Sequence, residues 1–374
     1  MLLGVLVLAA VAVAGAVALL ATRDEPDVPT PPPASPQPRS GEDVRYVSPS
    51  GSDDAEGTED APWKTIDHAL SEDRPGVRVL VRAGTYEDQI DRGPSGEEGR
   101  PMVVEAYPGE RPVVNAQLEL NGSSHLRVSG LVFDGEDTSG TAIRITGGED
   151  VELSRNEVRN YRGGDSSQGF LLTDGALRTR IVANRIHDLG TWSEHDHGIY
   201  CRSSDAAYFA NNVIYGIDQG VGIHLYDDDG EGCDDALIVA NTIVASQTSG
   251  IVLSRGADRN LVTGNVITGH ASSDTPSYGY AVREGAGVGE DNVVRGNLGW
   301  DNAQEPDFAC EGCEDNDEGD PRFRDPEAGD FRLGEGSAAL GGLPAEDAPR
   351  RDFTGRARPR DGEADRGAYQ AAAG

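Results

Sequence analysis

Short apolar segments alternate with polar ones along most of this chain, and between residues 151 and 298 they recur at a nearly constant interval. Each interval contains an asparagine with an apolar residue about three positions before it. The spacings between these asparagines are 28, 28, 29, 24 and 32 residues. A strand-rich repeat of this length, within the range of about 20–50 residues, indicates stacked coils. The asparagines are Asn156, Asn184, Asn212, Asn241, Asn265 and Asn297.

A second apolar strand lies between successive asparagines, and glycine often opens it. Ile199 and Cys201 share one face of such a strand and Tyr200 lies on the other. An interval that already holds two or three strands leaves no room for a helix, so each repeat is expected to be one coil of parallel strands. We expect the asparagines at corners, in the left-handed conformation that a tight bend needs, with their amides bonded from coil to coil. The second strands are residues 142–145, 169–172, 198–201, 222–225, 250–253 and 279–282.

This pattern resembles the right-handed parallel β-helix family of secreted or surface bacterial proteins, which is pectate-lyase-like. Residues 46–70 and the motifs RAGTYEDQI (82–90) and YPGERPVV (107–114) resemble the start of such proteins. Residues 320–340 and 352–370 resemble their irregular C-terminal tail. The resemblance implies an all-β domain over residues 44–370, with a short capping helix within residues 62–70 and an irregular C-terminal cap. It implies little about chemistry, because this fold includes lyases, hydrolases, epimerases and non-enzymatic surface proteins.

Charge and composition restrict the possible partners. The formal net charge of -33 argues against nucleic acid and anionic membrane surfaces as ligands. Acidic segments at 227–235 and 314–320 contain the oxygen ligands that calcium prefers. Neither has the spacing of a known calcium loop, so the favoured interpretation is a solvated acidic loop, and calcium stays an open alternative.

The N-terminal residues suggest attachment to a membrane. Residues 2–22 are almost wholly apolar and long enough to span a bilayer. No Lys or Arg precedes them, so an uncleaved anchor is favoured over a cleaved signal peptide, with the domain outside the cytoplasm. Residues 23–43 are proline-rich and predict a semi-rigid linker. Secretion after cleavage is the alternative.

The cysteines fit a location outside the cytoplasm. Cys310 and Cys313 could form half of a zinc site, but no second pair or histidine lies near them in sequence, so a local disulfide is favoured. A bond from Cys201 to Cys233, one coil later, is a second hypothesis. We predict no metal site at these cysteines.

One group of polar residues predicts a local surface patch. Aligning Gly198, Gly222 and Gly250 stacks Tyr200 on His224 and then on Val252, all facing outward. The same alignment stacks Arg202 on Tyr226, with His197 just before the strand. Acidic side chains beside the patch are Glu194, Asp196 and Asp227.

This patch suits a polysaccharide. Tyrosines stack on sugar rings, Arg202 can hold a carboxylate, and His197 or His224 can move a proton. We therefore predict catalytic roles for His197, His224 and Arg202. Substrate-binding roles are predicted for Tyr200, Tyr226, Asp227, Asp196 and Glu194. The only lysine, Lys64, lies in the expected cap and cannot be the base.

Two classes of function follow from this sequence. The first is a membrane-tethered protein that binds a polysaccharide and cleaves or epimerises it in the manner of a lyase. The second is a non-catalytic carbohydrate-binding or structural surface protein. If a histidine is the base, activity is expected to fall as the pH drops through the ordinary histidine range.

Overall fold

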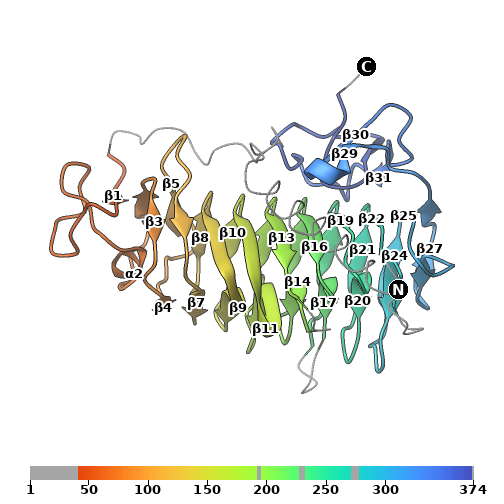
Figure 1. Cartoon of the computed structure of the whole chain (residues 1–374), viewed down its shortest axis with the longest axis horizontal. Helices are drawn as coiled ribbons and strands as arrows, with labels where there is room; N and C mark the ends of the chain where they lie inside the picture. Colours follow the sequence, from red (N-terminus) through yellow and green to blue (C-terminus); the bar gives the residue numbers. More distant parts are fainter. Residues whose placement is uncertain (1–40, 192–194, 227–231, 271–277, 373–374) are drawn as a thin grey trace, which may run out of the picture.

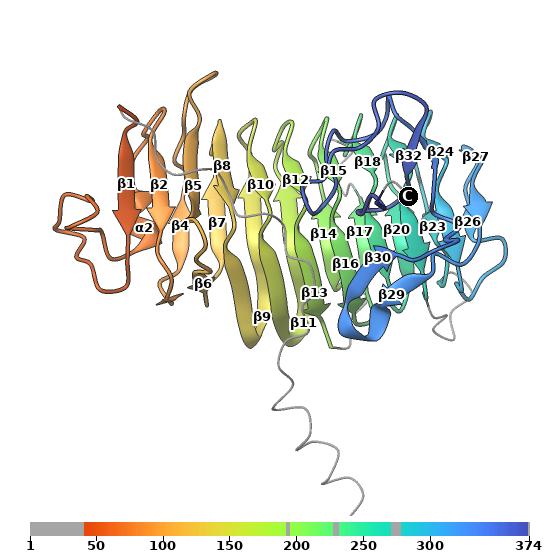
Figure 2. The same ribbon diagram turned by 90° about the horizontal axis from the view of Figure 1, so that it is seen from above.

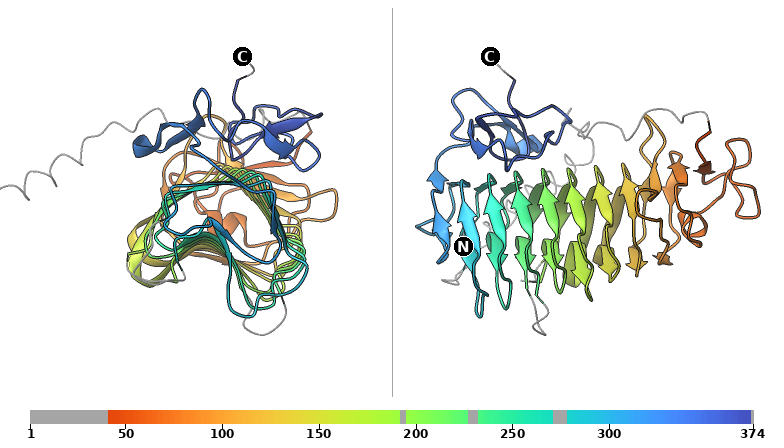
Figure 3. Two further views of the ribbon diagram at one scale, coloured as in Figure 1. Left: turned by 90° about the vertical axis from the view of Figure 1, so that its right-hand side faces the viewer. Right: turned by 180° about the vertical axis from the view of Figure 1, so that it is seen from behind.

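Parallel strands stack into one elongated solenoid in the computed structural model, which describes residues 41–191, 195–226, 232–270 and 278–372 (Figure 1). Strands from successive coils pair in parallel, and three sheets run along the long axis (Figure 2). Viewed down that axis, the coils superimpose around a common interior (Figure 3). The predicted all-β parallel β-helix is confirmed.

The first sheet pairs one strand from each coil along the whole solenoid. Its strands are β1 (Val44–Val47), β2 (Arg78–Val81), β5 (Met102–Ala106), β8 (Leu126–Ser129), β10 (Glu152–Ser154), β12 (Arg180–Val182), β15 (Tyr208–Ala210), β18 (Leu237–Val239), β21 (Leu261–Thr263), β24 (Val293–Arg295) and β27 (Cys313–Glu314).

Along the chain in each coil, the strand of the second sheet comes after the asparagine corner. The strand of the third sheet comes after that of the second sheet. Two long strands, β9 (Val132–Thr146) and β11 (Glu157–Thr173), contribute to both. The other strands of the second sheet are β3 (Thr85–Tyr86), β6 (Val113–Val114), β13 (Arg185–Leu189), β16 (Val213–Ile217), β19 (Thr242–Val244), β22 (Val266–Thr268), β25 (Leu298–Trp300) and β28 (Asp317–Glu318). Those of the third sheet are β4 (Ile90–Arg92), β7 (Leu118–Asn121), β14 (His197–Cys201), β17 (Val221–Leu225), β20 (Ser249–Leu253), β23 (Val282–Glu284) and β26 (Phe308–Ala309).

Inward side chains of the three sheets form one continuous, mostly aliphatic core. Equivalent positions repeat from coil to coil, so that the fully buried Ile199, Ile223 and Ile251 stack directly on one another. Such a column removes apolar surface from water in every coil, which stabilises the stack as a whole.

The six predicted asparagines form a buried hydrogen-bonded ladder at the corner between the first and second sheets. The Asn184 side-chain amide donates to Asn212 Oδ1 at 3.1 Å, and that oxygen also accepts the Asn184 backbone N–H at 2.9 Å. The same pattern links every successive pair and extends one coil further, to Asn316. The predicted bonding from coil to coil is therefore confirmed.

The left-handed conformation, however, belongs to the residue before each ladder asparagine. Ala183, Asn211 and Ala240 have φ values of 54°, 56° and 55°, and Gly264 and Gly296 occupy the equivalent positions with positive φ. The prediction that the ladder asparagines themselves turn the corner was therefore wrong. Their amides are needed instead to satisfy buried backbone groups of the neighbouring coils.

The chain before and after the coils has little regular structure. A four-residue helix, α2 (Ile66–Ala69), buries Ile66 and Ala69 near β4, and Thr65 caps it by accepting the His68 N–H at 3.0 Å. It is shorter than the predicted segment, and its role in covering the end of the solenoid stays a prediction. The C-terminal segment, residues 319–372, holds β29 (Phe323–Asp325), the 3-10 helix η1 (Pro326–Ala328), β30 (Asp330–Leu333), β31 (Gly342–Pro344) and β32 (Glu363–Asp365).

This C-terminal segment packs along the later coils (Figure 3). Its Phe331 and Phe353 are buried with Val213 of the second sheet. The predicted anchor (2–22) and most of the predicted linker (23–43) lie outside the described residues. Within the described residues, no helix is both long and apolar enough to cross a bilayer.

Candidate functional site

The predicted patch lies on the outer surface of the third sheet, in the middle of the solenoid. Strand pairing places Tyr200 of β14 directly beside His224 of β17, and His224 directly beside Val252 of β20. The predicted register is therefore correct at these positions. These paired residues form a column across the sheet. In the same column, Leu171 of β11 pairs with Tyr200, and Arg283 of β23 pairs with Val252.

Four aromatic rings are in mutual contact here. The rings of Tyr200 and His224 are nearly parallel, with centroids 5.3 Å apart. Tyr226 lies 5.4 Å from the His224 centroid, and His197 lies 4.6 Å from Tyr200 and 5.0 Å from His224. We call these four residues the aromatic cluster. Tyr200, His224 and Tyr226 are partly exposed, so the cluster presents ring faces to a ligand.

His197 reaches this cluster because glycine interrupts the alternation of the strand. A Cβ on Gly198 would lie 2.6 Å from the Gly222 carbonyl oxygen and 2.8 Å from the Ile214 side chain, so only glycine fits there. The strand is therefore tightly packed on the core at Gly198, and the His197 ring lies against Tyr200 and His224. The prediction that His197 is an outward surface residue needs correction, because it is only 2% exposed beneath its neighbours.

The two histidines form a short polar chain that ends at a serine. His224 Nδ1 lies 3.4 Å from His197 Nε2, and His224 Nε2 lies 3.0 Å from Ser254 Oγ. The Ser254 hydroxyl can also donate to the Leu225 carbonyl at 3.2 Å. Both ring nitrogens of His224 therefore have partners within the protein.

Burial keeps both histidines neutral. It lowers the pKa of His224 to about 3, with further contributions from the neighbouring Arg283 and His195 side chains. Burial also lowers the pKa of His197 well below its ordinary value, and the neighbouring His224 and His195 act in the same direction. A neutral imidazole can accept a proton, so either ring is in the form that a general base requires.

Arginines border the aromatic cluster. The Arg202 guanidinium carbon lies 5.8 Å from the Tyr200 ring centroid, and that of Arg255 lies 5.4 Å from the Tyr226 centroid. Arg283 lies in the same column of paired residues as His224, two strands further along the sheet. A guanidinium is a group that can hold an anion such as a carboxylate, so these arginines are candidates for that role.

The structure does not place any of the three predicted acidic residues on the surface of the patch. The Asp196 side chain is only 1% exposed, and its carboxylate accepts the backbone N–H groups of Ser167 at 2.7 Å and Thr191 at 3.2 Å. A carboxylate that satisfies buried amides is not available to a ligand, so the predicted binding role of Asp196 needs correction. Glu194 and Asp227 lie outside the described residues.

Sequence reasoning missed Arg283 because the alignment of the patch did not reach its strand. The alignment on glycines covered Gly198, Gly222 and Gly250 and was not extended to the following strand. In the structure Ile251 pairs with Val282, so Val252 pairs with Arg283. The spacing of inward residues Val282 and Ile251 could have revealed this register.

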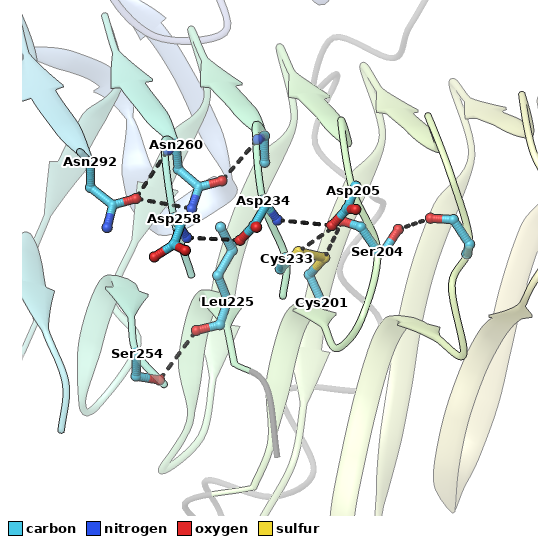
Figure 4. Close-up of a disulfide and its surroundings, with 12 residues drawn as sticks. Cys201, Ser204, Asp205, Leu225, Cys233, Asp234, Ser254, Asp258, Asn260 and Asn292 are labelled. Atoms are coloured by element: carbon cyan, nitrogen blue, oxygen red, sulfur yellow. Dashed lines mark hydrogen bonds between the residues drawn. A yellow bond between two sulfur atoms is a disulfide. The ribbon is translucent and has the colours of Figure 1, made fainter. Parts of the chain in front are cut away.

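Disulfides join Cys201 to Cys233 and Cys310 to Cys313. Cys201 lies between Tyr200 and Arg202, so the first disulfide connects the patch to the next coil (Figure 4). Beyond it lies a corner where the Asp205, Asp234 and Asp258 carboxylates each accept a backbone N–H from the next coil. These bonds order the backbone beside the patch.

Two groups of described carboxylates that could hold a cation are already paired with arginines. Of the first acidic segment proposed for calcium, Asp234 and Asp235 contact Arg259 at 3.0 and 2.9 Å, while residues 227–231 are not described. His125, Glu149 and Asp150 also converge, but Arg178 binds Glu149 and Asp150 at 2.6 and 2.9 Å. No cation site is derived from either group.

A second polar cluster, on the second sheet, is internally satisfied. His187 contacts Glu157 at 3.2 Å and Asp188 at 2.7 Å, and Arg159 contacts Glu157 at 3.2 Å. Despite burial, these contacts lower the pKa of Glu157 to about 2. Burial opposes protonation of His187, but its contacts with the Asp188 and Glu157 carboxylates raise its pKa. Complete pairing of this kind is expected of a structural ion network.

Comparison with known proteins agrees with this geometry. The family model described as Pel9A-like, right handed beta helix region, matches residues 45–232. The chain is 29% identical over 137 residues to "Uncharacterized protein YwoF" of Bacillus subtilis (strain 168), covering 32% of this chain and 29% of that protein. It is 41% identical over 80 residues to "Pectate lyase PEL9" of Emericella nidulans (strain FGSC A4), covering 21% of this chain and 19% of that protein.

These matches therefore span less than a third of either relative. Among solved structures, one titled "Glycoside hydrolase" aligns with a TM-score of 0.51 and 10% identity, over 74% of this chain and 96% of that one, a likeness in fold alone. Because the family model spans half of the sequence and its described architecture matches the observed coils, the chain belongs to the Pel9A-like right-handed β-helix family.

Proposed function

We propose that this protein binds an acidic polysaccharide at the aromatic cluster and removes a proton from one of its sugars, as a lyase or an epimerase. The observation that carries the proposal is the direct contact of two neutral histidines with stacked tyrosines, bordered by arginines. Membership of the Pel9A-like family and similarity to a protein named pectate lyase support a carbohydrate substrate.

In this proposal each part of the cluster has a defined role. Tyr200 and Tyr226 stack against sugar rings. Arg202 binds the carboxylate of the reacting sugar and stabilises the negative charge that develops when the adjacent C–H proton leaves. The neutral His224 takes that proton, and His197 supports the charged ring through their contact.

The fate of the electron pair distinguishes the two reactions. In elimination, the electrons of the broken C–H bond form a C=C bond, the neighbouring glycosidic C–O bond breaks, and the leaving oxygen takes a proton. In epimerisation, no C–O bond breaks, and a proton returns to the same carbon from the opposite face. Lys64 cannot be the base in either case, because it is exposed in the segment before α2, near the N-terminal end of the solenoid.

The test is turnover by the purified protein on uronate and neutral polysaccharides. Unsaturated ends, new reducing ends and exchange of the sugar C–H with solvent deuterium are followed in parallel. His224→Gln is expected to lower kcat by about 100-fold or more. A matched control is His68→Gln, in α2 far from the cluster, which should retain full activity. Undiminished turnover in both His224→Gln and His197→Gln would contradict the assignment.

The pH dependence of turnover is a second test. Since the pKa of His224 is about 3, the base stays neutral as the pH falls through the ordinary histidine range. Activity should therefore persist to well below pH 6 and be lost only toward pH 3, or where the fold fails. This replaces the expectation from sequence, which assumed an unperturbed histidine.

One observation favours non-catalytic binding as a second candidate. Both nitrogens of His224 already have protein partners, as expected of a residue that only shapes a binding surface. Tight binding of an oligosaccharide without turnover or deuterium exchange would establish this alternative.

We also propose that the domain is held outside the cytoplasm by residues 2–22. Two disulfides favour an oxidising compartment. Protease added to intact cells should release the domain by cutting within residues 24–43. Full-length protein in the soluble cytosolic fraction would contradict this location.

A further inference from the structure

Arg283 occupies the outer surface of the third sheet at a position that no sequence motif identified. It lies on β23 and pairs with Val252 of β20, which in turn pairs with His224 of β17. Its guanidinium carbon lies 5.7 Å from the Tyr278 ring centroid. The Arg283 charge acts on the pKa of His224, so the two side chains belong to one electrostatic environment.

The charge of Arg283 has no acidic partner among the described residues. No ion pair joins it to any of the described carboxylates, and its Nε is buried without a hydrogen bond. The groups that face it are Tyr278, Tyr280, His224 and Val252. Burial is the main influence on its pKa, which is lowered.

An unpaired, partly desolvated guanidinium is costly to the folded protein. The cost is notable in this chain, because 65 acidic residues are available as partners. By comparison, Arg180 also packs on a tyrosine, Tyr208 at 4.2 Å, but its Nε contacts Glu152 at 3.2 Å. Arg283 has the same kind of aromatic contact without the carboxylate.

We infer that Arg283 is a specificity-determining residue whose missing partner is a carboxylate of the bound glycan. The inference rests on the proposed function, since it assumes that a glycan occupies the aromatic cluster. A guanidinium fork matches a carboxylate with two parallel hydrogen bonds, which a lysine cannot reproduce.

The position of Arg283 also specifies which sugar it recognises. Its backbone lies two strand spacings, about 10 Å, from that of His224. Arg202 instead borders Tyr200, on the other side of His224. Arg283 therefore binds the carboxylate of a sugar neighbouring the reacting one, and the site requires an oligosaccharide with more than one acidic residue.

Calorimetric binding tests this inference without requiring turnover. The probes are uronic-acid oligosaccharides of increasing length and the same oligosaccharides with their carboxyl groups reduced to alcohols. Arg283→Gln should weaken binding of the acidic trimer by at least about tenfold and leave the reduced trimer unaffected. Arg283→Lys should recover only part of the loss. Arg180→Gln, the matched control, should bind as the unaltered protein does.

Thermal unfolding of the unliganded variants separates recognition from a structural role. Removing a partly buried charge that has no described acidic partner should leave the melting temperature of Arg283→Gln unchanged or raise it. A fall of several degrees would overturn the inference, as would unchanged binding of the acidic trimer. If the protein binds acidic oligosaccharides through Arg283 but turns none over, the inference stands and the proposed reaction fails.

Discussion

Asn211 and Asn212 are adjacent in the chain but have different roles. Asn211 adopts the left-handed conformation, with a φ of 56°, and its side chain bonds to the C-terminal segment at Arg351 O (2.8 Å) and Arg358 (3.0 Å). Asn212 is fully buried and bonds to the coils on both sides. One residue therefore turns the chain while the next joins the coils.

Asn212→Leu should destabilise the protein because it removes hydrogen bonds that have no substitute. The Asn184 N–H and the Ile181 carbonyl lose partners in a site that water cannot reach. Each buried unsatisfied group costs about 1–3 kcal/mol, so a loss of several kcal/mol is expected in chemical denaturation. Asn121→Ala is the control, because Asn121 is exposed, and it should change stability by less than about 0.5 kcal/mol.

Buried histidines should make the fold sensitive to acid. Burial lowers the pKa of His224 to about 3 and that of His270 to about 4, and also lowers that of His197. In the unfolded chain these groups titrate near pH 6.5. The unfolded state therefore binds more protons between about pH 6.5 and 3, and the unfolding free energy falls as the pH drops through that window.

His270→Leu removes one of these groups without touching the aromatic cluster. Its unfolding free energy should depend less steeply on pH between about 6 and 4 than that of the unaltered protein. Urea denaturation at a series of pH values measures this difference. Identical slopes for the two proteins would show that folding does not shift the pKa of His270.

The repeat predicted the ladder and the Tyr200–His224 contact because both depend only on the spacing of coils. It did not predict the burial of His197 or Asp196, because each depends on how one coil departs from the repeat. Gly198 interrupts strand alternation, and Asp196 turns inward to bond backbone amides. Arg283 was missed because the alignment on glycines stopped at Gly250, one strand before the one whose pairing places Arg283 beside Val252.

At the level of elements, the two disulfides differ in what they connect. Cys201–Cys233 joins consecutive coils across 32 residues, next to the aromatic cluster. Cys310–Cys313 closes a loop of sequence separation 3 at the end of the coils. Cross-linking a longer loop restricts the unfolded chain more, so the first bond should contribute more stability.

The Cys201→Ala/Cys233→Ala variant should lose about 2–4 kcal/mol of unfolding free energy. It should also weaken glycan binding, because Cys201 separates Tyr200 from Arg202 on β14. The Cys310→Ala/Cys313→Ala variant should lose less stability and bind normally. Equal losses in the two double variants would indicate that loop length does not control the effect.

At the scale of the whole molecule, the C-terminal segment acts as a brace along the later coils. Its backbone bonds directly to them, with the Gly367 N–H donating to Gly264 O at 2.8 Å and the Ala368 N–H to Thr242 Oγ1 at 2.9 Å. Phe331 is buried against Tyr215, at 5.1 Å between ring centroids, and against Phe323, at 5.2 Å. The brace lies opposite the third sheet in Figure 1, away from β14, β17 and β20, so it leaves the aromatic cluster open.

Phe331→Ala should therefore destabilise the molecule unevenly. Loss of a fully buried phenylalanine costs about 3–5 kcal/mol, and in a solenoid each coil contacts only its neighbours. Amide hydrogen exchange should accelerate in β16, β19 and the C-terminal segment, while β2 and β5, at the far end, stay protected. Leu340→Ala, at a residue that is 43% exposed, is the control and should change neither region. Uniform acceleration along every coil would mean that the solenoid unfolds as a single cooperative unit, and that the segment stabilises all coils equally.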